Sequence, residues 1–218
     1  MALYQKLSLP FPSTPLATPE SVLIYGGSGV VGMKGVQLAK LSGYTVITTA
    51  SISNTELLKS LGADHVLDYR SKTLVQDILE ANGGRKLRRA WDAQAVEGSA
   101  EVCLSVLQDS EESIFGSNGG PRPSSLKGLN PKVRWEGINA FTAYGEKFWL
   151  FGLNEPVLED FEFASKVFEM AAGLLKQGKL KPTRVFVNKG GKGLEGMVDG
   201  LEELGSGAVR GGKLVYTL

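Results

Sequence analysis

Three glycines near the start of the chain have the spacing of a phosphate-binding turn. Gly27, Gly29 and Gly32 form the pattern G-x-G-x-x-G, directly after the apolar run Ser21–Tyr25 and before a stretch with helical spacing. The pattern carries weight only between a strand and a helix, which is its context here. Free amides at a helix N-terminus attract anions, so the spacing predicts a site for the diphosphate of a dinucleotide.

Each glycine of this turn has an expected role. We assign Gly27 to the tight turn, Gly29 to the close approach of a diphosphate, and Gly32 to close packing of the helix on the strand. The Ser28 hydroxyl adds a hydrogen-bond donor. The alternative is a glycine-rich turn between strand and helix that binds no ligand.

The residues that follow the second predicted strand favour NADP over NAD. An NAD site needs a carboxylate about 20 residues beyond the glycines for the ribose 2′-hydroxyl, and residues 48–54 contain none. Ser51, Ser53 and Asn54 offer donors to a 2′-phosphate, and Lys59 or Arg70 could add positive charge. The alternative is that these polar residues only cap the next helix.

The pattern of elements predicts the fold class. Short apolar or β-branched runs at 21–25, 44–49, 65–67, 90–95 and 113–115 alternate with helical spacing at 31–43, 56–61, 74–80 and 100–107. Apolar strands that alternate with helices are typical of a parallel sheet covered on both faces. We therefore expect an α/β fold with a doubly wound, mostly parallel, Rossmann-like sheet.

The remaining segments are less regular. We expect residues 1–20, with four prolines, to be an extended lead-in, in which ALYQKLSL could form a short helix with no obvious packing surface, and 21–218 to be the dinucleotide-binding domain. Residues 117–132 form a long polar loop and 133–144 a mixed segment. A long helix at 157–177, a strand at 184–187, a helix at 194–204 and a strand at 213–217 complete the chain.

Composition excludes several classes of protein. The 24 basic and 23 acidic residues give a net charge of +1, which does not suit a nucleic-acid partner. No apolar run reaches the ~18 residues of a membrane span. One cysteine and one histidine make a metal cluster improbable. We expect a soluble, cytoplasmic protein with no membrane, nucleic-acid or metal partner.

Three isolated residues have ordinary structural interpretations. His65 starts a predicted strand and is expected at the surface, and Cys103 lies in the apolar stretch EVCLSVL and is expected in the core. Asp92 could act as an acid, but a carboxylate near a strand end more often orders a loop or caps a helix. The aromatic stretch 135–151 could line a substrate cavity, pack in the core or form a dimer contact.

The ordered motifs resemble a known family. The segments YGGSGVVG, ASISN, LLKSLGADHVLDYR, FTAYGEKF, LLKQGKL and GLEGMVDGLEELGSGAVRGGKLVYTL are similar to the medium-chain dehydrogenase/reductase superfamily. Within it, the chain resembles the zinc-independent quinone reductase and fungal trans-acting enoyl reductase branch along nearly its whole length. The resemblance implies that an N-terminal GroES-like catalytic domain is absent here, and that the last strand normally returns to that domain.

The resemblance also implies a set of site residues for NADPH. Ser28 to Gly32 would lie against the diphosphate, and Ser51, Ser53 and Asn54 against the 2′-phosphate. Thr55 stands near a position where quinone reductases often have a lysine, so charge pairing there is not expected. The remaining implied residues lie near the adenine ribose, the nicotinamide and the last strand: Val30, Val31, Tyr69, Gly116, Ser117, Gly145, Val209 and Arg210.

The implied activity is reduction by NADPH. The resemblance implies an enoyl or quinone reductase that acts on an α,β-unsaturated carbonyl of a polyketide-like small molecule, free or bound to a carrier protein. Tyr144 is the expected catalytic residue because its hydroxyl could donate a proton near the nicotinamide. The alternative is a redox-silent member that serves as a cyclase, ligand-binding or accessory protein, and a homodimer or a synthase partner would fit either activity.

Overall fold

The computed structural model of the chain describes residues 1–150, 152–209 and 211–218. Its main strands are β1 (Ser21–Tyr25), β2 (Thr45–Ala50), β3 (His65–Asp68), β4 (Arg89–Asp92), β5 (Ile114–Ser117) and β6 (Arg134–Gly137). Its α-helices are α1 (Val30–Leu41), α2 (Thr55–Ser60), α3 (Leu74–Ala81), α4 (Ser99–Val106), α5 (Leu158–Lys176) and α6 (Gly193–Gly205). Short elements are η1 (Ala2–Lys6), η2 (Ile52–Asn54), η3 (Ser124–Leu126), η4 (Ala140–Tyr144), β7 (Phe148–Trp149), β8 (Leu153–Asn154), β9 (Val185–Val187) and β10 (Lys213–Val215).

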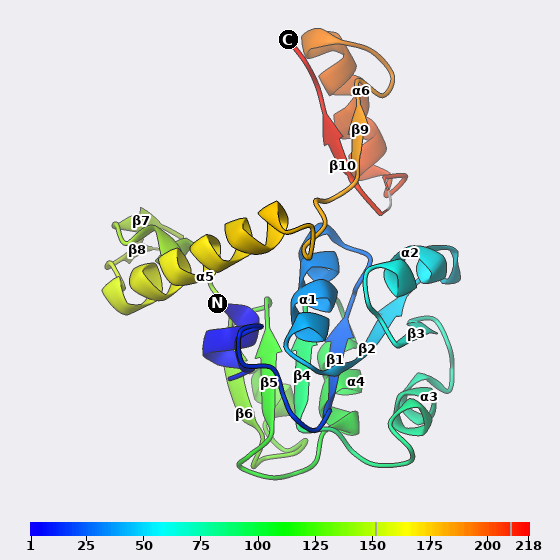
Figure 1. Cartoon of the computed structure of the whole chain (residues 1–218), viewed down its shortest axis with the longest axis vertical. Helices are drawn as coiled ribbons and strands as arrows, with labels where there is room; N and C mark the ends of the chain where they lie inside the picture. Colours follow the sequence, from blue (N-terminus) through cyan, green and yellow to red (C-terminus); the bar gives the residue numbers. More distant parts are fainter. Residues whose placement is uncertain (151, 210) are drawn as a thin grey trace.

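The six main strands form one parallel sheet in the order β3-β2-β1-β4-β5-β6 (Figure 1). Each neighbouring pair is parallel, from β2 with β3 at one edge to β5 with β6 at the other. The chain runs outward from β1 in one direction and then returns to build the other half. The predicted doubly wound α/β fold is therefore confirmed.

The central strand β1 explains why both faces of the sheet are covered. Alternate side chains of a strand point to opposite faces. Val22 and Ile24 belong to a core that includes Val36 of α1, whereas Leu23 and Tyr25 belong to a second core with residues of α3 and α4. All four side chains are buried, which is why the run SVLIY is apolar without alternation.

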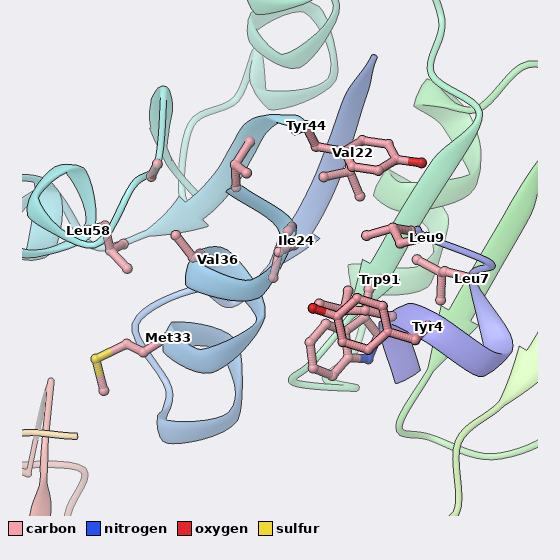
Figure 2. Close-up of a cluster of buried hydrophobic side chains, with 14 of the residues drawn as sticks. Tyr4, Leu7, Leu9, Val22, Ile24, Met33, Val36, Tyr44, Leu58 and Trp91 are labelled. Carbon is pink, nitrogen blue, oxygen red and sulfur yellow. The ribbon is translucent and has the colours of Figure 1, made fainter. Parts of the chain in front are cut away.

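The N-terminal segment is part of the first core, contrary to the expectation that it has no obvious packing surface. Ala2–Lys6 forms one π-helical turn, and Leu3, Leu7 and Leu9 are buried. Figure 2 shows Tyr4, Leu7 and Leu9 in the same cluster as Trp91 and Ile24. The Arg89 guanidinium also donates to the Leu7 carbonyl (Nε–O 2.9 Å), which fixes the segment to β4.

The C-terminal third is built beside the main sheet. Before it, the sixth strand of the main sheet, β6, lies within residues 133–144, for which the sequence predicts a mixed segment. The last predicted strands, β9 and β10, pair in parallel with each other and not with the main sheet, and β7 and β8 form a short antiparallel pair. Figure 1 shows α5 crossing beside the sheet before the chain reaches α6, β9 and β10.

Two isolated residues lie where the sequence predicts. Cys103 is fully buried in α4, and this burial raises the pKa of its thiol well above the ordinary value, so the thiol stays protonated. His65 is exposed at the start of β3. In the part of the chain that the structure describes, no helix is both long enough and apolar enough to cross a membrane.

Leu7→Ala tests whether the N-terminal segment belongs to the fold. The Leu7 side chain is fully buried, so its truncation should lower the free energy of unfolding by about 2–5 kcal/mol. Leu158→Ala is the matched control because Leu158 is 65% exposed, and it should change the free energy of unfolding by less than about 0.5 kcal/mol. Urea unfolding followed by circular dichroism measures both, and equal midpoints for the two variants would contradict the assignment.

Candidate functional site

A cavity of about 520 Å³ lies at the carboxyl ends of the central strands. It opens where the chain changes direction, between β1 and β4, which is the usual ligand position in an open parallel sheet. Its walls come from the first βα turn, the ends of β2, β3 and β4, and the segment before β10. The lining residues are Tyr25, Gly26, Ser28, Gly29, Val30, Thr49, Ala50, Ser51, Asn54, Tyr69, Gln94, Val96, Leu204, Gly207, Val209, Gly211 and Gly212.

The glycine turn forms the floor of this cavity, but the structural role of Gly27 differs from the expectation. The left-handed residue of the turn is Gly26 (φ 84°), not Gly27. Gly27 is needed because a Cβ there would overlap the Thr48 hydroxyl oxygen. A Cβ on Gly32 would overlap the Gly26 carbonyl oxygen, so the predicted role of Gly32 in close helix–strand packing is confirmed.

Two threonines of β2 hold the turn in place. The Thr49 hydroxyl accepts a hydrogen bond from the Gly26 amide (2.9 Å), and the Thr49 carbonyl accepts one from the Gly27 amide (2.9 Å). The Thr48 hydroxyl donates to the Ile24 carbonyl (2.7 Å). Because these contacts fix the backbone on one side, the amides of the following helix face the cavity in a defined direction.

The start of α1 is suited to an anion. Gly29 is the N-cap in an extended conformation and provides no side-chain cap, and the first turn of the helix contains no acidic residue. The first amides of a helix have no acceptor within it, and they carry the positive end of its dipole. The cavity-lining residues that the structure describes include no carboxylate. The floor can therefore receive a diphosphate without charge repulsion.

The residues after β2 separate into two groups. Ser51 and Asn54 line the cavity, whereas Ser53 is exposed outside its lining. Asn54 is the N-cap of α2 and Ser51 the N-cap of η2, but neither makes a side-chain capping hydrogen bond. The capping alternative therefore does not account for these two side chains, and they remain available to a ligand.

The end of β3 adds an aromatic wall. Tyr69 lines the cavity and is 46% exposed. The neighbouring Arg70 guanidinium lies 5.5 Å from the Tyr69 ring and pairs with Asp68 through two contacts of 3.0 Å. Hydrogen bonds from Arg70 lower the pKa of the Asp68 carboxyl. Arg70 is thus engaged by Asp68, which argues against its expected role as a free charge for a phosphate.

The loop after β4 is ordered by one buried carboxylate. Asp92 Oδ1 accepts hydrogen bonds from the amides of Gln94 (3.1 Å) and Ala95 (2.8 Å). Asp92 Oδ2 accepts from the Ser99 hydroxyl (2.5 Å) at the start of α4. Ala95 adopts a left-handed conformation (φ 54°), which is costly for a residue with a Cβ. The loop-ordering interpretation of Asp92 is therefore confirmed.

Several predicted residues lie outside the cavity lining. Val31 is 51% exposed, and Gly116 packs so closely that a Cβ there would lie 2.5 Å from the Leu7 Cδ1. The Ser117 hydroxyl accepts from the Gly119 amide (3.0 Å). Tyr144 ends η4 with 65% exposure, and the next residue, Gly145, packs against Phe161. Val31 thus lies within the glycine turn but outside the cavity lining, and the structure does not bring the other four residues to the turn.

Part of the aromatic stretch lines a second cavity. This cavity of about 800 Å³ lies at the carboxyl ends of β5 and β6, and Trp135 and Phe141 contribute to its wall. Arg122 stabilises its rim by donating to the carbonyls of Leu126 and Leu129. Phe151 lies outside the described residues. Of the alternatives that the sequence leaves open for this stretch, cavity lining applies to Trp135 and Phe141, and Trp135 also packs against Phe115 of the core.

The structure adds lining residues that the sequence does not indicate. Val209, which the resemblance places near the cofactor, lines the first cavity, and Arg210 lies outside the described residues. Leu204, Gly207, Gly211 and Gly212 form the wall beside it. Gln94 and Val96 follow β4, and the pairing of β4 with β1 would have indicated this loop as a neighbour of the glycine turn.

The sequence is similar to characterised dehydrogenases and reductases. Residues 30–134 match the zinc-binding dehydrogenase family. The chain is 32% identical over 234 residues to the trans-enoyl reductase resD of Aspergillus sclerotiorum, covering 98% of this chain and 62% of resD. It is 35% identical over 221 residues to the trans-enoyl reductase ACTTS2 of Alternaria alternata, covering 100% of this chain and 60% of ACTTS2. The chain thus spans about 60% of the length of these curated relatives.

The fold is shared with solved structures of the same kind. The Escherichia coli quinone oxidoreductase complexed with NADPH superimposes with a TM-score of 0.69 at 21% identity, over 98% of this chain and 60% of that one. The JamJ enoyl reductase superimposes with a TM-score of 0.70 at 17% identity, over 98% of this chain and 59% of that one. Sequence and fold together show that the chain belongs to the medium-chain dehydrogenase/reductase superfamily, in the branch of the fungal trans-enoyl reductases.

Proposed function

We propose that the chain binds NADPH in the cavity at the carboxyl ends of β1 and β2. The observation that carries this proposal is the glycine corner, where the unpaired amides at the start of α1 face a cavity whose described lining has no carboxylate. Ser28, Gly29 and Val30 would hold the diphosphate. Ser51 and Asn54 would hold the 2′-phosphate, and Tyr69 would lie beside the adenine ribose.

The residues present fit this cofactor. Gly29 has no Cβ at the N-cap of α1, which leaves the backbone open to close approach. Burial raises the pKa of Tyr25, so its hydroxyl stays protonated at the inner wall and remains a hydrogen-bond donor. When bound, NADPH supplies a hydride, while the chain contributes binding, orientation and exclusion of water.

The proposed reaction is reduction of an α,β-unsaturated carbonyl. The support is the family: relatives at 32% and 35% identity are named trans-enoyl reductases. A polyketide-like substrate, free or on a carrier protein, fits that family, and a synthase or a second copy of the chain would be its partner. The cavity lined by Trp135 and Phe141 offers an apolar wall for such a substrate.

Titration with reduced coenzymes tests the binding proposal. NADPH fluorescence should change on addition of the protein, and the dissociation constant for NADPH should be at least about tenfold lower than that for NADH, because NADH lacks the group that Ser51 and Asn54 would bind. Isothermal calorimetry gives both constants. Absence of heat with either coenzyme would contradict the proposal.

Replacing Ser51 by aspartate should reverse the preference. A carboxylate at the cavity wall would repel a 2′-phosphate, so Ser51→Asp should weaken NADPH binding by about tenfold or more and leave NADH binding similar or stronger. Ser53→Asp is the matched control because Ser53 is exposed outside the cavity lining. Equal losses of NADPH affinity in the two variants would show that the effect is not local to the cavity wall.

Turnover tests the reductase activity separately from binding. Absorbance at 340 nm should fall when NADPH and an α,β-unsaturated acyl thioester are added to the protein. The expectation that the Tyr144 hydroxyl donates a proton predicts that Tyr144→Phe lowers kcat while the affinity for NADPH stays unchanged. NADPH binding without turnover on thioesters or ketones would contradict the reductase and favour a redox-silent role.

A further inference from the structure

The side chain of Gln94 lies across the glycine turn. A Cβ built on Gly26 would overlap the Gln94 Cγ, and a Cβ on Gly29 would lie 3.0 Å from the Gln94 Nε2. The aliphatic part of Gln94 therefore packs on the backbone of Gly26. Its carboxamide reaches the N-cap of α1, at the floor of the first cavity.

The loop that carries Gln94 is held in this position. Asp92 Oδ1 accepts the amide protons of both Gln94 and Ala95, and Asp92 Oδ2 is fixed by Ser99. Asp92 is 1% exposed and Ser99 is fully buried, so these contacts are shielded from water. They maintain the left-handed conformation of Ala95. The backbone from which the Gln94 side chain extends is thus held by a buried network.

The Gln94 carboxamide offers donors to the same place as the helix amides. A glutamine amide nitrogen carries two N–H groups. Among the described residues, Gln94 makes a hydrogen bond only through its backbone amide, and its side chain makes none. The Gln94 carboxamide and the first amides of α1 therefore all present N–H donors. A group with several acceptor oxygens could bind between them. A diphosphate has that chemistry.

We propose that Gln94 binds the diphosphate of the dinucleotide, opposite the amides of α1. The proposal rests on NADPH binding as proposed above and extends it to the loop after β4. Gln94 would close the floor of the cavity from the side of β4, while the helix amides contact the diphosphate from the other side. A hydrogen bond to a charged group changes affinity by about ten- to hundredfold.

Gln94→Leu tests this role with two ligands. Leucine keeps most of the side-chain volume on Gly26 but removes the donors, so the dissociation constant for NADPH should rise about tenfold or more. Adenosine 2′-monophosphate lacks the diphosphate, so its dissociation constant should stay within about twofold of wild type. Gln177→Leu is the control, since Gln177 is an exposed glutamine at the end of α5, and it should alter neither constant.

Three outcomes would overturn the proposal. Unchanged NADPH affinity in Gln94→Leu would show that the carboxamide makes no useful contact. An equal loss for both ligands would show a general distortion of the cavity. Tighter NADPH binding by Gln94→Ala would show that the side chain obstructs the floor. If wild-type protein binds neither ligand, NADPH binding itself fails, whereas normal wild-type binding with any of these three outcomes removes only the role of Gln94.

Discussion

The close contact between Gly32 and the carbonyl of Gly26 determines the geometry of the first βα corner. Because neither Gly32 nor Gly27 has a Cβ, α1 starts directly against the ends of β1 and β2. That approach brings the positive end of the helix to the edge where the parallel strands of the sheet terminate. Any side chain at these positions would move the helix away from the sheet. The cavity therefore exists at this corner because the backbone itself forms its floor.

The order of strands and helices could be predicted because interior parallel strands are apolar on both faces. Ser21–Tyr25 and Thr45–Ala50 are such runs, and a left-handed glycine follows each of the first two helices, Gly43 after α1 and Gly62 after α2. The sequence does not indicate the edge strand Arg134–Gly137, because this strand has one neighbouring strand and contains charged residues. The sequence does not indicate the burial of the N-terminal turn, because leucine spacing alone does not show which surface a turn covers.

The position of a residue in the cavity lining could be predicted where residues close in sequence are also close in space. The glycine turn lies within one strand–helix unit, so its spacing alone gave its position. The sequence groups Ser53 with Ser51, yet Ile52 separates the two in the η2 turn and only Ser51 lies on the wall. Gln94 and Gly211 are distant in sequence from the turn. Their place on the wall follows from strand order and from the path of the C-terminal segment, which spacing does not reveal.

The buried amide of Gln37 has a consequence for the far wall of the cavity. Gln37 is 4% exposed in α1, and its Oε1 accepts a hydrogen bond from the Lys181 amide (2.7 Å), where the chain leaves α5. If the chain at Lys181 shifted by one residue along α1, the buried Gln37 side chain would lose this hydrogen-bond partner. The loss would cost about 1–3 kcal/mol, because water does not reach the Gln37 oxygen. Gln37 thus fixes the position of the segment after α5 relative to α1. The helix whose first amides form the cavity floor therefore also determines where the chain begins its path toward Val209 and Gly211.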